Sequence, residues 1–104
     1  MLCSYRQVHK GGAFRLVYMR VENMRTASGG YAANQFLIRT GGGVVFQSYR
    51  SQIATKCNDG TVTLYNPYWD NYSATTNRYL LQFLNENSIR DIREKVKSGE
   101  YLTA

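Results

Sequence analysis

The chain has 104 residues, and its 13 Lys and Arg residues outnumber seven Asp and Glu residues to give a net charge of +6. This length fits one domain, which we place at 1–104 with residues 1–12 flexible, and the 43% apolar residues argue against a disordered chain. The chain shows no apolar run long enough for a membrane span or a signal peptide, so we expect a cytoplasmic protein. The positive charge indicates an anionic partner, although solubility alone also explains such a charge.

The first two thirds of the chain predict an antiparallel meander of four or five strands. Runs rich in aromatic and β-branched residues, typical of strands, occur at 14–21, 34–40, 44–49, 52–56 and 61–65. Asn58-Asp59-Gly60 is the clearest hairpin turn, and the three glycines at 41–43 permit a second tight reversal. Residues 23–30 have only a weak pattern and are expected to form a loop.

Two helices are predicted in the last third of the chain. Pro67 ends the last strand, and Ser73 can cap a helix that begins near Thr75. Ser88 can cap a second helix, which Gly99 would end. The apolar stripes are Tyr79, Leu80, Phe83 and Leu84 on the first helix and Ile89, Ile92 and Val96 on the second. Because both helices follow the sheet, we expect them to pack on one of its faces, which is an α+β fold.

Clusters of reactive side chains are missing from the sequence. No group of His, Cys, Asp and Glu has the spacing of a metal site or a catalytic triad, so we expect no enzyme, no metal and no cofactor. Cys3 and Cys57 lie far apart in the sequence, and we expect two reduced thiols. The alternative is a disulfide between them, which would tie the N-terminus to a hairpin.

The segment 46–52 (FQSYRSQ) is the first candidate site. If Val44 and Phe46 face the core, Gln47 and Tyr49 lie on the opposite face. We expect Arg39 to neighbour them there. The resulting cationic patch, suited to phosphates or base edges, consists of Arg39, Gln47, Tyr49 and Arg50. We favour the structural interpretation, in which the polar side chains satisfy backbone groups at a bulge and Tyr49 covers the sheet.

Aromatic residues between the last strand and the first helix are the second candidate. They are Tyr65, Tyr68, Trp69, Tyr72 and Tyr79. They either form a stacking platform for bases or a small core that holds the connection against the helix. We assign Trp69 to the core and leave Tyr68 and Tyr72 open. The cations of the last helix, Arg90, Arg93, Lys95 and Lys97, are expected to form a solvated face.

Three segments resemble a family of small uncharacterised proteins carried by bacteriophages and plasmids. They are 34–38 (NQFLI), 46–54 (FQSYRSQIA) and 69–84, in which Trp69 precedes a YSATT helix start. The family's pattern differs at Asn71 and in the glycine-rich region before Asn34. The resemblance implies a mobile-element context, in which such proteins are often accessory or counter-defence factors, including anti-CRISPR inhibitors.

These observations predict a non-catalytic counter-defence protein that acts by binding. Its expected contacts are Arg39, Gln47, Tyr49, Arg50, Lys56, Tyr68 and Tyr72. The expected partner is a host defence protein or ribonucleoprotein, such as a CRISPR effector. One alternative is direct binding of nucleic acid or a signalling nucleotide, and another is a structural or assembly protein that forms a homo-oligomer.

Overall fold

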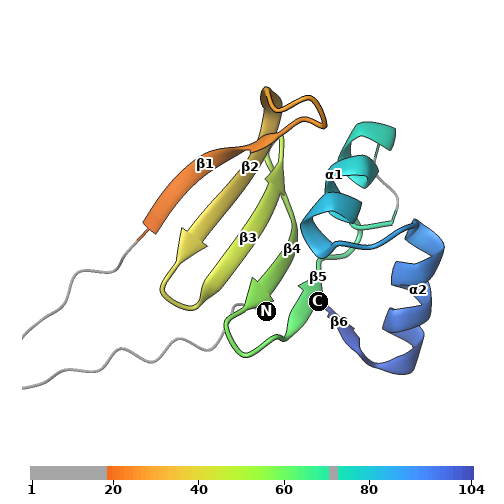
Figure 1. Cartoon of the computed structure of the whole chain (residues 1–104). Coiled ribbons are helices and arrows are strands. Elements are labelled where there is room, and N and C mark those ends of the chain that lie inside the picture. The colour runs from red at the N-terminus through yellow and green to blue at the C-terminus, as the bar shows by residue number, and fades with distance from the viewer. Residues whose placement is uncertain (1–18, 71–72) are drawn as a thin grey trace, which may run out of the picture.

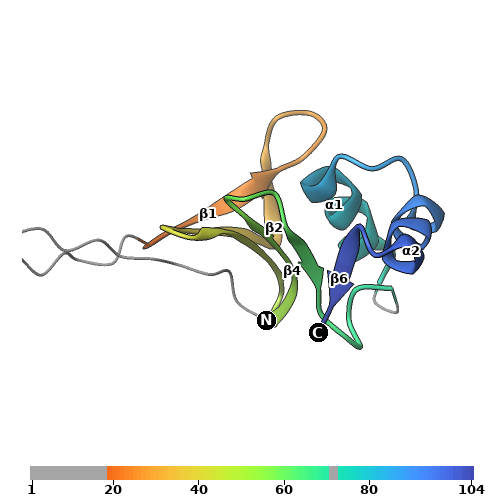
Figure 2. The same ribbon diagram turned by 90° about the horizontal axis from the view of Figure 1, so that it is seen from below.

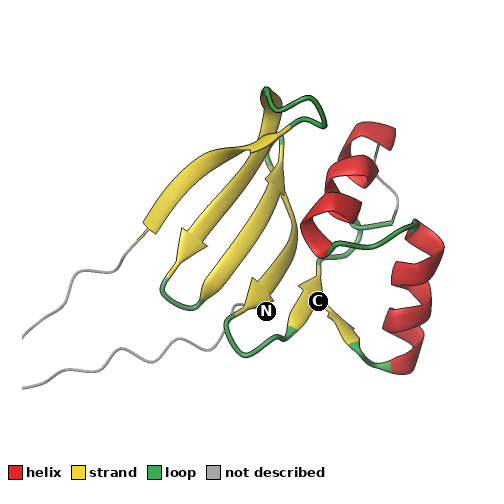
Figure 3. Ribbon diagram, in the orientation of Figure 1, coloured by secondary structure: helices red, strands yellow, loops and turns green. Residues whose placement is uncertain are grey.

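A computed structural model describes residues 19–70 and 73–104 of the chain. Along the chain, five strands are followed by two helices and a short final strand (Figures 1 and 3). The strands are β1 (Met19–Arg25), β2 (Tyr31–Thr40), β3 (Gly43–Ser48), β4 (Ser51–Cys57), β5 (Val62–Leu64) and β6 (Tyr101–Thr103), and the helices are α1 (Ala74–Leu84) and α2 (Ile89–Ser98). They form one six-stranded sheet in sequential order, antiparallel from β1 to β5, with β6 parallel to β5.

The predicted α+β class is confirmed, with both helices on one side of the sheet (Figures 1 and 2). The hairpin turn ending at Gly60 is confirmed, and Gly60 has a φ of 93°, a conformation that glycine adopts without strain. Ser73 and Ser88 cap the helices as expected, because each side chain accepts a hydrogen bond from a backbone N–H in the first turn. Gly99 ends α2 in the left-handed conformation.

Three expectations about the strands and cysteines need correction. Residues 23–25 belong to β1 instead of a loop, and β2 begins at Tyr31, earlier than predicted. The strand β6 was not predicted, because three residues carry no readable alternation and their partner β5 is distant in sequence. Cys57 is disulfide-bonded, so the expectation of a reduced thiol there is wrong. Cys3, residues 14–18 and the segment expected to be flexible, 1–12, lie outside the described residues.

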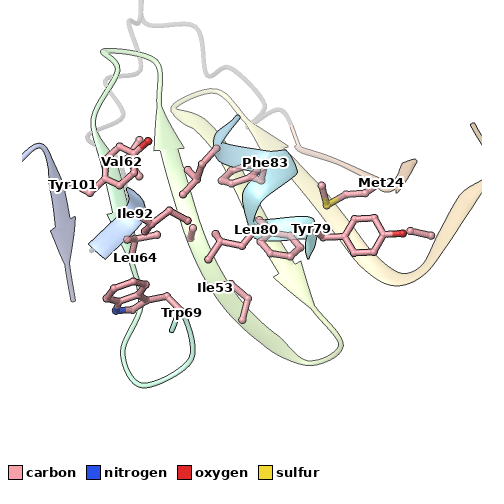
Figure 4. Close-up of a cluster of buried hydrophobic side chains, with 14 residues drawn as sticks. Met24, Ile53, Val62, Leu64, Trp69, Tyr79, Leu80, Phe83, Ile92 and Tyr101 are labelled. Carbon is pink, nitrogen blue, oxygen red and sulfur yellow. The ribbon is translucent and has the colours of Figure 1, made fainter. Parts of the chain in front are cut away.

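The core lies between the sheet and the two helices. Phe46 of β3 and Phe83 of α1 pack with ring centroids 5.6 Å apart. Trp69 is buried as predicted, and its Nε1 donates a 2.8 Å hydrogen bond to Asn66 Oδ1. Figure 4 shows Met24 at one end of the cluster and Tyr101 at the other. None of the helices in the described part of the chain is long and apolar enough to cross a membrane.

The outer strands β1 and β2 extend beyond the helices (Figures 1 and 2). A direct link to α1 is formed by Gln82, whose Nε2 donates a 3.0 Å hydrogen bond to the carbonyl oxygen of Arg25. Deeper in the structure, the hydroxyls of Ser48 and Thr76 are hydrogen-bonded at 2.7 Å and join β3 to the first turn of α1. Next to Gln82, the outer part of the sheet face is left accessible beside the C-terminal end of α1.

Candidate functional site

Three cations line up across the helix-bearing face of the sheet. Arg20 of β1 lies opposite Arg39 of β2. Val44 of β3 lies opposite Arg39 on one side and opposite Lys56 of β4 on the other. Directly opposite residues point to the same face, and neighbouring strands lie about 4.8 Å apart. Arg20, Arg39 and Lys56 therefore form a row perpendicular to the strands, which we call the cationic row.

The cationic row runs into a groove between the outer strands and the C-terminal half of α1. A pocket of about 210 Å³ lies between Arg39, Lys56 and the helix, with an apolar floor. Its lining residues are Met24, Leu37, Arg39, Val44, Lys56, Gln82 and Phe83. The groove thus combines positive charge with apolar surface, a combination that suits an anionic group carried on an apolar or ring-shaped body.

A second pocket of about 370 Å³ continues the groove toward the β1–β2 hairpin. It shares Met24, Leu37, Arg39 and Gln82 with the first pocket. It adds Glu22, Asn23, Arg25 and Tyr31. We name the two adjoining pockets together the Arg39–Lys56 groove.

Glu22 supplies the negative charge beside the cationic row. Its Oε1 accepts a 2.7 Å hydrogen bond from Arg39 Nε, and its Oε2 lies 3.4 Å from Arg20 Nη2. The hydrogen bond from Arg39, together with the positive charges nearby, lowers the pKa of the Glu22 carboxyl below its ordinary value. Glu22 is therefore ionised at neutral pH and holds the two arginines side by side.

Lys56 has a different environment. Its Nζ donates a 2.7 Å hydrogen bond to the carbonyl oxygen of Phe83, in the last turn of α1, and lies 4.6 Å from the centre of the Phe83 ring. Among the described residues, no carboxylate forms an ion pair with Lys56. Burial, and then the positive charge of Arg39, lower the pKa of the Lys56 amine. An incoming anion would relieve this electrostatic cost.

At the hairpin end of the groove, Arg25 and Tyr31 form an exposed stack. The Arg25 guanidinium lies 4.1 Å from the centre of the Tyr31 ring. It also donates hydrogen bonds to the carbonyl oxygen of Gly29 at 2.9 Å and to the Tyr31 hydroxyl at 3.3 Å. Tyr31 remains 70% exposed. The ring is therefore oriented by Arg25 and still offers surface to a ligand.

Two of the candidate binding residues, Arg39 and Lys56, come together in this groove. Gln47 does not join them, since it lies opposite Phe36, while Arg39 lies opposite Val44. Alternation then places Gln47 on the other face of the sheet, so the expectation of one patch containing both is wrong. The structural interpretation of Gln47 is confirmed, because its Nε2 donates a 2.9 Å hydrogen bond to the carbonyl oxygen of Tyr49, next to a bulge.

The other candidates lie outside the groove. Tyr49 and Arg50 are exposed in the β3–β4 turn, where Tyr49 has a φ of 55°. Tyr68 is 40% exposed in the turn after β5. Tyr72 lies outside the described residues. None of the described three lines the Arg39–Lys56 groove.

The sequence interpretation missed Arg25 because residues 23–30 were expected to form a loop, and it missed Glu22 and Tyr31 because they flank that loop and were assigned to no strand. The available signal was the Gly29-Gly30 pair, which is typical of a tight hairpin turn. Arg20 was missed because its role depends on being paired with Arg39. In the described part of the chain, no group of three His, Cys, Asp or Glu residues is arranged to hold a metal ion.

Comparison with known protein families matches residues 19–99 to one model, described as a family of unknown function, DUF8033. The matched region includes all three segments that resemble phage and plasmid proteins. Neither the comparison with curated proteins nor that with solved structures found a match.

Proposed function

We propose that this chain, which belongs to DUF8033, a family of unknown function, is a non-catalytic protein that binds an anionic partner in the Arg39–Lys56 groove. The observation that carries the proposal is the convergence of Arg39 and Lys56 on one pocket from β2 and β4. Lys56 is partly buried there and contacts a helix carbonyl. Because no carboxylate of the described residues pairs with Lys56, an incoming anion would supply its missing counter-charge, and charge-assisted hydrogen bonds of this kind are strong.

Direct binding is tested with a panel of anions that includes single-stranded DNA, RNA, nucleotides and an acidic peptide. We expect at least one to bind, and binding to weaken steeply between about 50 and 200 mM salt, because released counterions contribute to affinity. Arg39→Ala and Lys56→Ala should each weaken binding about tenfold or more, since each removes a charge-assisted contact. Arg90→Ala and Lys97→Ala are matched controls, because both residues are exposed on α2.

If no member of the panel binds, or if the α2 controls weaken binding as much as the groove variants, direct binding of an anion in the groove is contradicted. A circular dichroism spectrum and a melting curve of each variant separate loss of binding from loss of folding.

We further propose that the partner belongs to a host defence system, such as a CRISPR effector, so that the protein is a counter-defence inhibitor. The support is the resemblance of 34–38, 46–54 and 69–84 to phage and plasmid proteins, since the DUF8033 match carries no information on origin. Affinity capture from lysate of bacteria that express a defence complex tests this proposal. The complex should be retained by the wild type and lost with the Arg39→Ala/Lys56→Ala double variant. Equal retention by both, or capture of chaperones alone, would contradict it.

A further inference from the structure

We propose that the anionic group bound in the groove is a nucleotide, free or within a nucleic-acid strand, with its base stacked on Tyr31 and its phosphate held by Arg39 and Lys56. The inference rests on the proposed function, because it uses the same groove and names the ligand. A free nucleotide and a nucleotide within a single strand share this chemistry, and the experiment below separates them.

The base position follows from the exposure of Tyr31. The ring is 70% exposed, although Arg25 contacts it at 4.1 Å. Arg25 is itself anchored to the hairpin through the carbonyl oxygen of Gly29. An exposed tyrosine that is held in place loses little conformational freedom when a base stacks on it, and an adjacent guanidinium adds a cation–π contribution.

The phosphate position follows from the other end of the groove. The ordinary ligands of nucleotide phosphates in proteins are guanidinium and ammonium groups, which Arg39 and Lys56 supply from opposite sides of Val44. The pocket between them has a volume of about 210 Å³. This volume suits a phosphate group better than a whole nucleoside.

The space between these ends fits a nucleoside. The hairpin pocket of about 370 Å³ lies within the usual range of ligand sites, about 300–1,000 Å³. Gln82 lines both pockets, and its Nε2 donates one hydrogen bond to the Arg25 carbonyl oxygen, which leaves Oε1 and a second N–H of the carboxamide for a ligand. Carboxamides donate and accept hydrogen bonds and are common partners of base edges.

An acidic peptide is the competing macromolecular ligand, and the structure favours the nucleotide over it. Acidic side chains would use Arg20, Arg39 and Lys56 but would have no need of an exposed ring beside Arg25. The two ligands therefore differ in their dependence on Tyr31.

Calorimetric titration tests the inference with AMP, ribose 5-phosphate, a short adenylate strand and a glutamate-rich peptide. We expect AMP to bind at least tenfold more tightly than ribose 5-phosphate, which has the phosphate without the base. Tyr31→Ala should weaken AMP about tenfold and leave ribose 5-phosphate unchanged, whereas Tyr31→Phe keeps the stack. Tyr49→Ala is the matched control, because it removes an exposed tyrosine outside the groove. A strand that binds much more tightly than AMP identifies a nucleic acid as the source, and equal affinity identifies the free nucleotide.

The outcomes separate this inference from the proposed function. The nucleotide inference is wrong if ribose 5-phosphate binds as well as AMP, or if the peptide binds best. The proposed binding of an anion in the groove still stands in that case, provided that Arg39→Ala weakens the binding. If none of the four ligands binds at low salt, the nucleotide inference is overturned, and failure of the full anion panel overturns the proposed function as well.

Discussion

Arg20 and Arg39 lie directly opposite each other across β1 and β2, and the carboxylate of Glu22 contacts both. Like charges placed opposite each other on neighbouring strands are destabilising. Glu22 offsets this repulsion in the free protein. It also occupies the Arg39 Nε–H, a donor that an anionic ligand would use, and therefore competes with the ligand.

Replacing Glu22 by Gln should tighten anion binding. The substitution removes the competing charge and keeps the side-chain size, so Arg39 becomes available to the ligand. The gain should shrink as salt rises, because exposed charges are screened. Titration of Glu22→Gln and wild type at two salt concentrations measures this, and Glu94→Gln on the exposed face of α2 is the control. Weaker binding by Glu22→Gln would mean that the carboxylate positions Arg39 for the ligand and does not compete with it.

Anion affinity should fall in alkaline solution as Lys56 loses its proton. Burial and the charge of Arg39 place the pKa of Lys56 below its ordinary 10.5, so the loss begins at a lower pH than for an exposed lysine. Lys56→Arg should keep its affinity across the same range, because a guanidinium stays protonated. Titrations of both proteins from neutral to alkaline pH give the comparison. Parallel pH profiles would show that Lys56 does not contact the ligand.

The same lysine should affect folding in the opposite direction. Between its lowered folded pKa and 10.5, the unfolded chain holds the Lys56 proton more tightly than the folded chain does. The contribution of Lys56 to the free energy of unfolding therefore increases as pH rises through this window. Urea unfolding of wild type and Lys56→Met at several alkaline pH values measures it. The advantage of Lys56→Met over wild type should narrow as pH rises, and a constant difference would contradict the assignment.

Glu86 should stabilise the fold in a pH-dependent way. Its side chain is only 8% exposed, and its carboxylate accepts hydrogen bonds from the Tyr101 hydroxyl and, at 2.6 Å, from Lys95 Nζ. Burial opposes its ionisation, but these two donors outweigh burial and lower the pKa of Glu86 below 4.5. The stabilisation is therefore present above pH 4.5 and lost as pH falls through the folded pKa.

Tyr101→Phe tests this network with little change in packing. Removing a hydrogen bond to a charged, buried acceptor should lower the free energy of unfolding by about 1.5–3 kcal/mol at neutral pH. The difference from wild type should shrink in acid, where Glu86 is protonated. Tyr49→Phe, at a tyrosine with 47% exposure, is the control. If Tyr101→Phe lowered the free energy of unfolding by the same amount at every pH, the loss would come from packing and not from the hydrogen bond to Glu86.

Gln35→Met should stabilise the protein. Gln35 is fully buried in β2, and within the described part of the chain neither polar atom of its amide has a hydrogen-bond partner. Methionine has a similar shape without the polar atoms, so the free energy of unfolding should rise by about 1–3 kcal/mol. The exposed Gln52→Met is the control for the change in composition. A loss of stability would mean that the Gln35 amide is hydrogen-bonded in solution.

The sequence was informative where structure is local. Ser73, Ser88 and Gly99 mark helix ends through hydrogen bonds or backbone conformations that involve only near neighbours. The fold class followed from the change from strand periodicity to helix periodicity, and it is confirmed. The strand β6 could not be predicted, because its position depends on the distant β5 and on the packing of α2.

The groove was predictable only in part. Arg39 and Lys56 were both identified as binding candidates, but Arg39 was grouped with Gln47. The strand register decides which side chains of β2 and β3 share a face of the sheet. A connection with three glycines allows more than one register. The structure sets it by pairing Arg39 with Val44. The cationic row exists only once that register is fixed.

The hydrogen bond from Gln82 to the Arg25 carbonyl oxygen shapes the entrance of the Arg39–Lys56 groove. It joins the C-terminal half of α1 to β1, while the Ser48–Thr76 hydrogen bond holds the first turn of the helix and the apolar cluster packs the helix on the sheet. Because Gln82 also lines both pockets, this hydrogen bond fixes one wall of the Arg39–Lys56 groove where α1 meets β1.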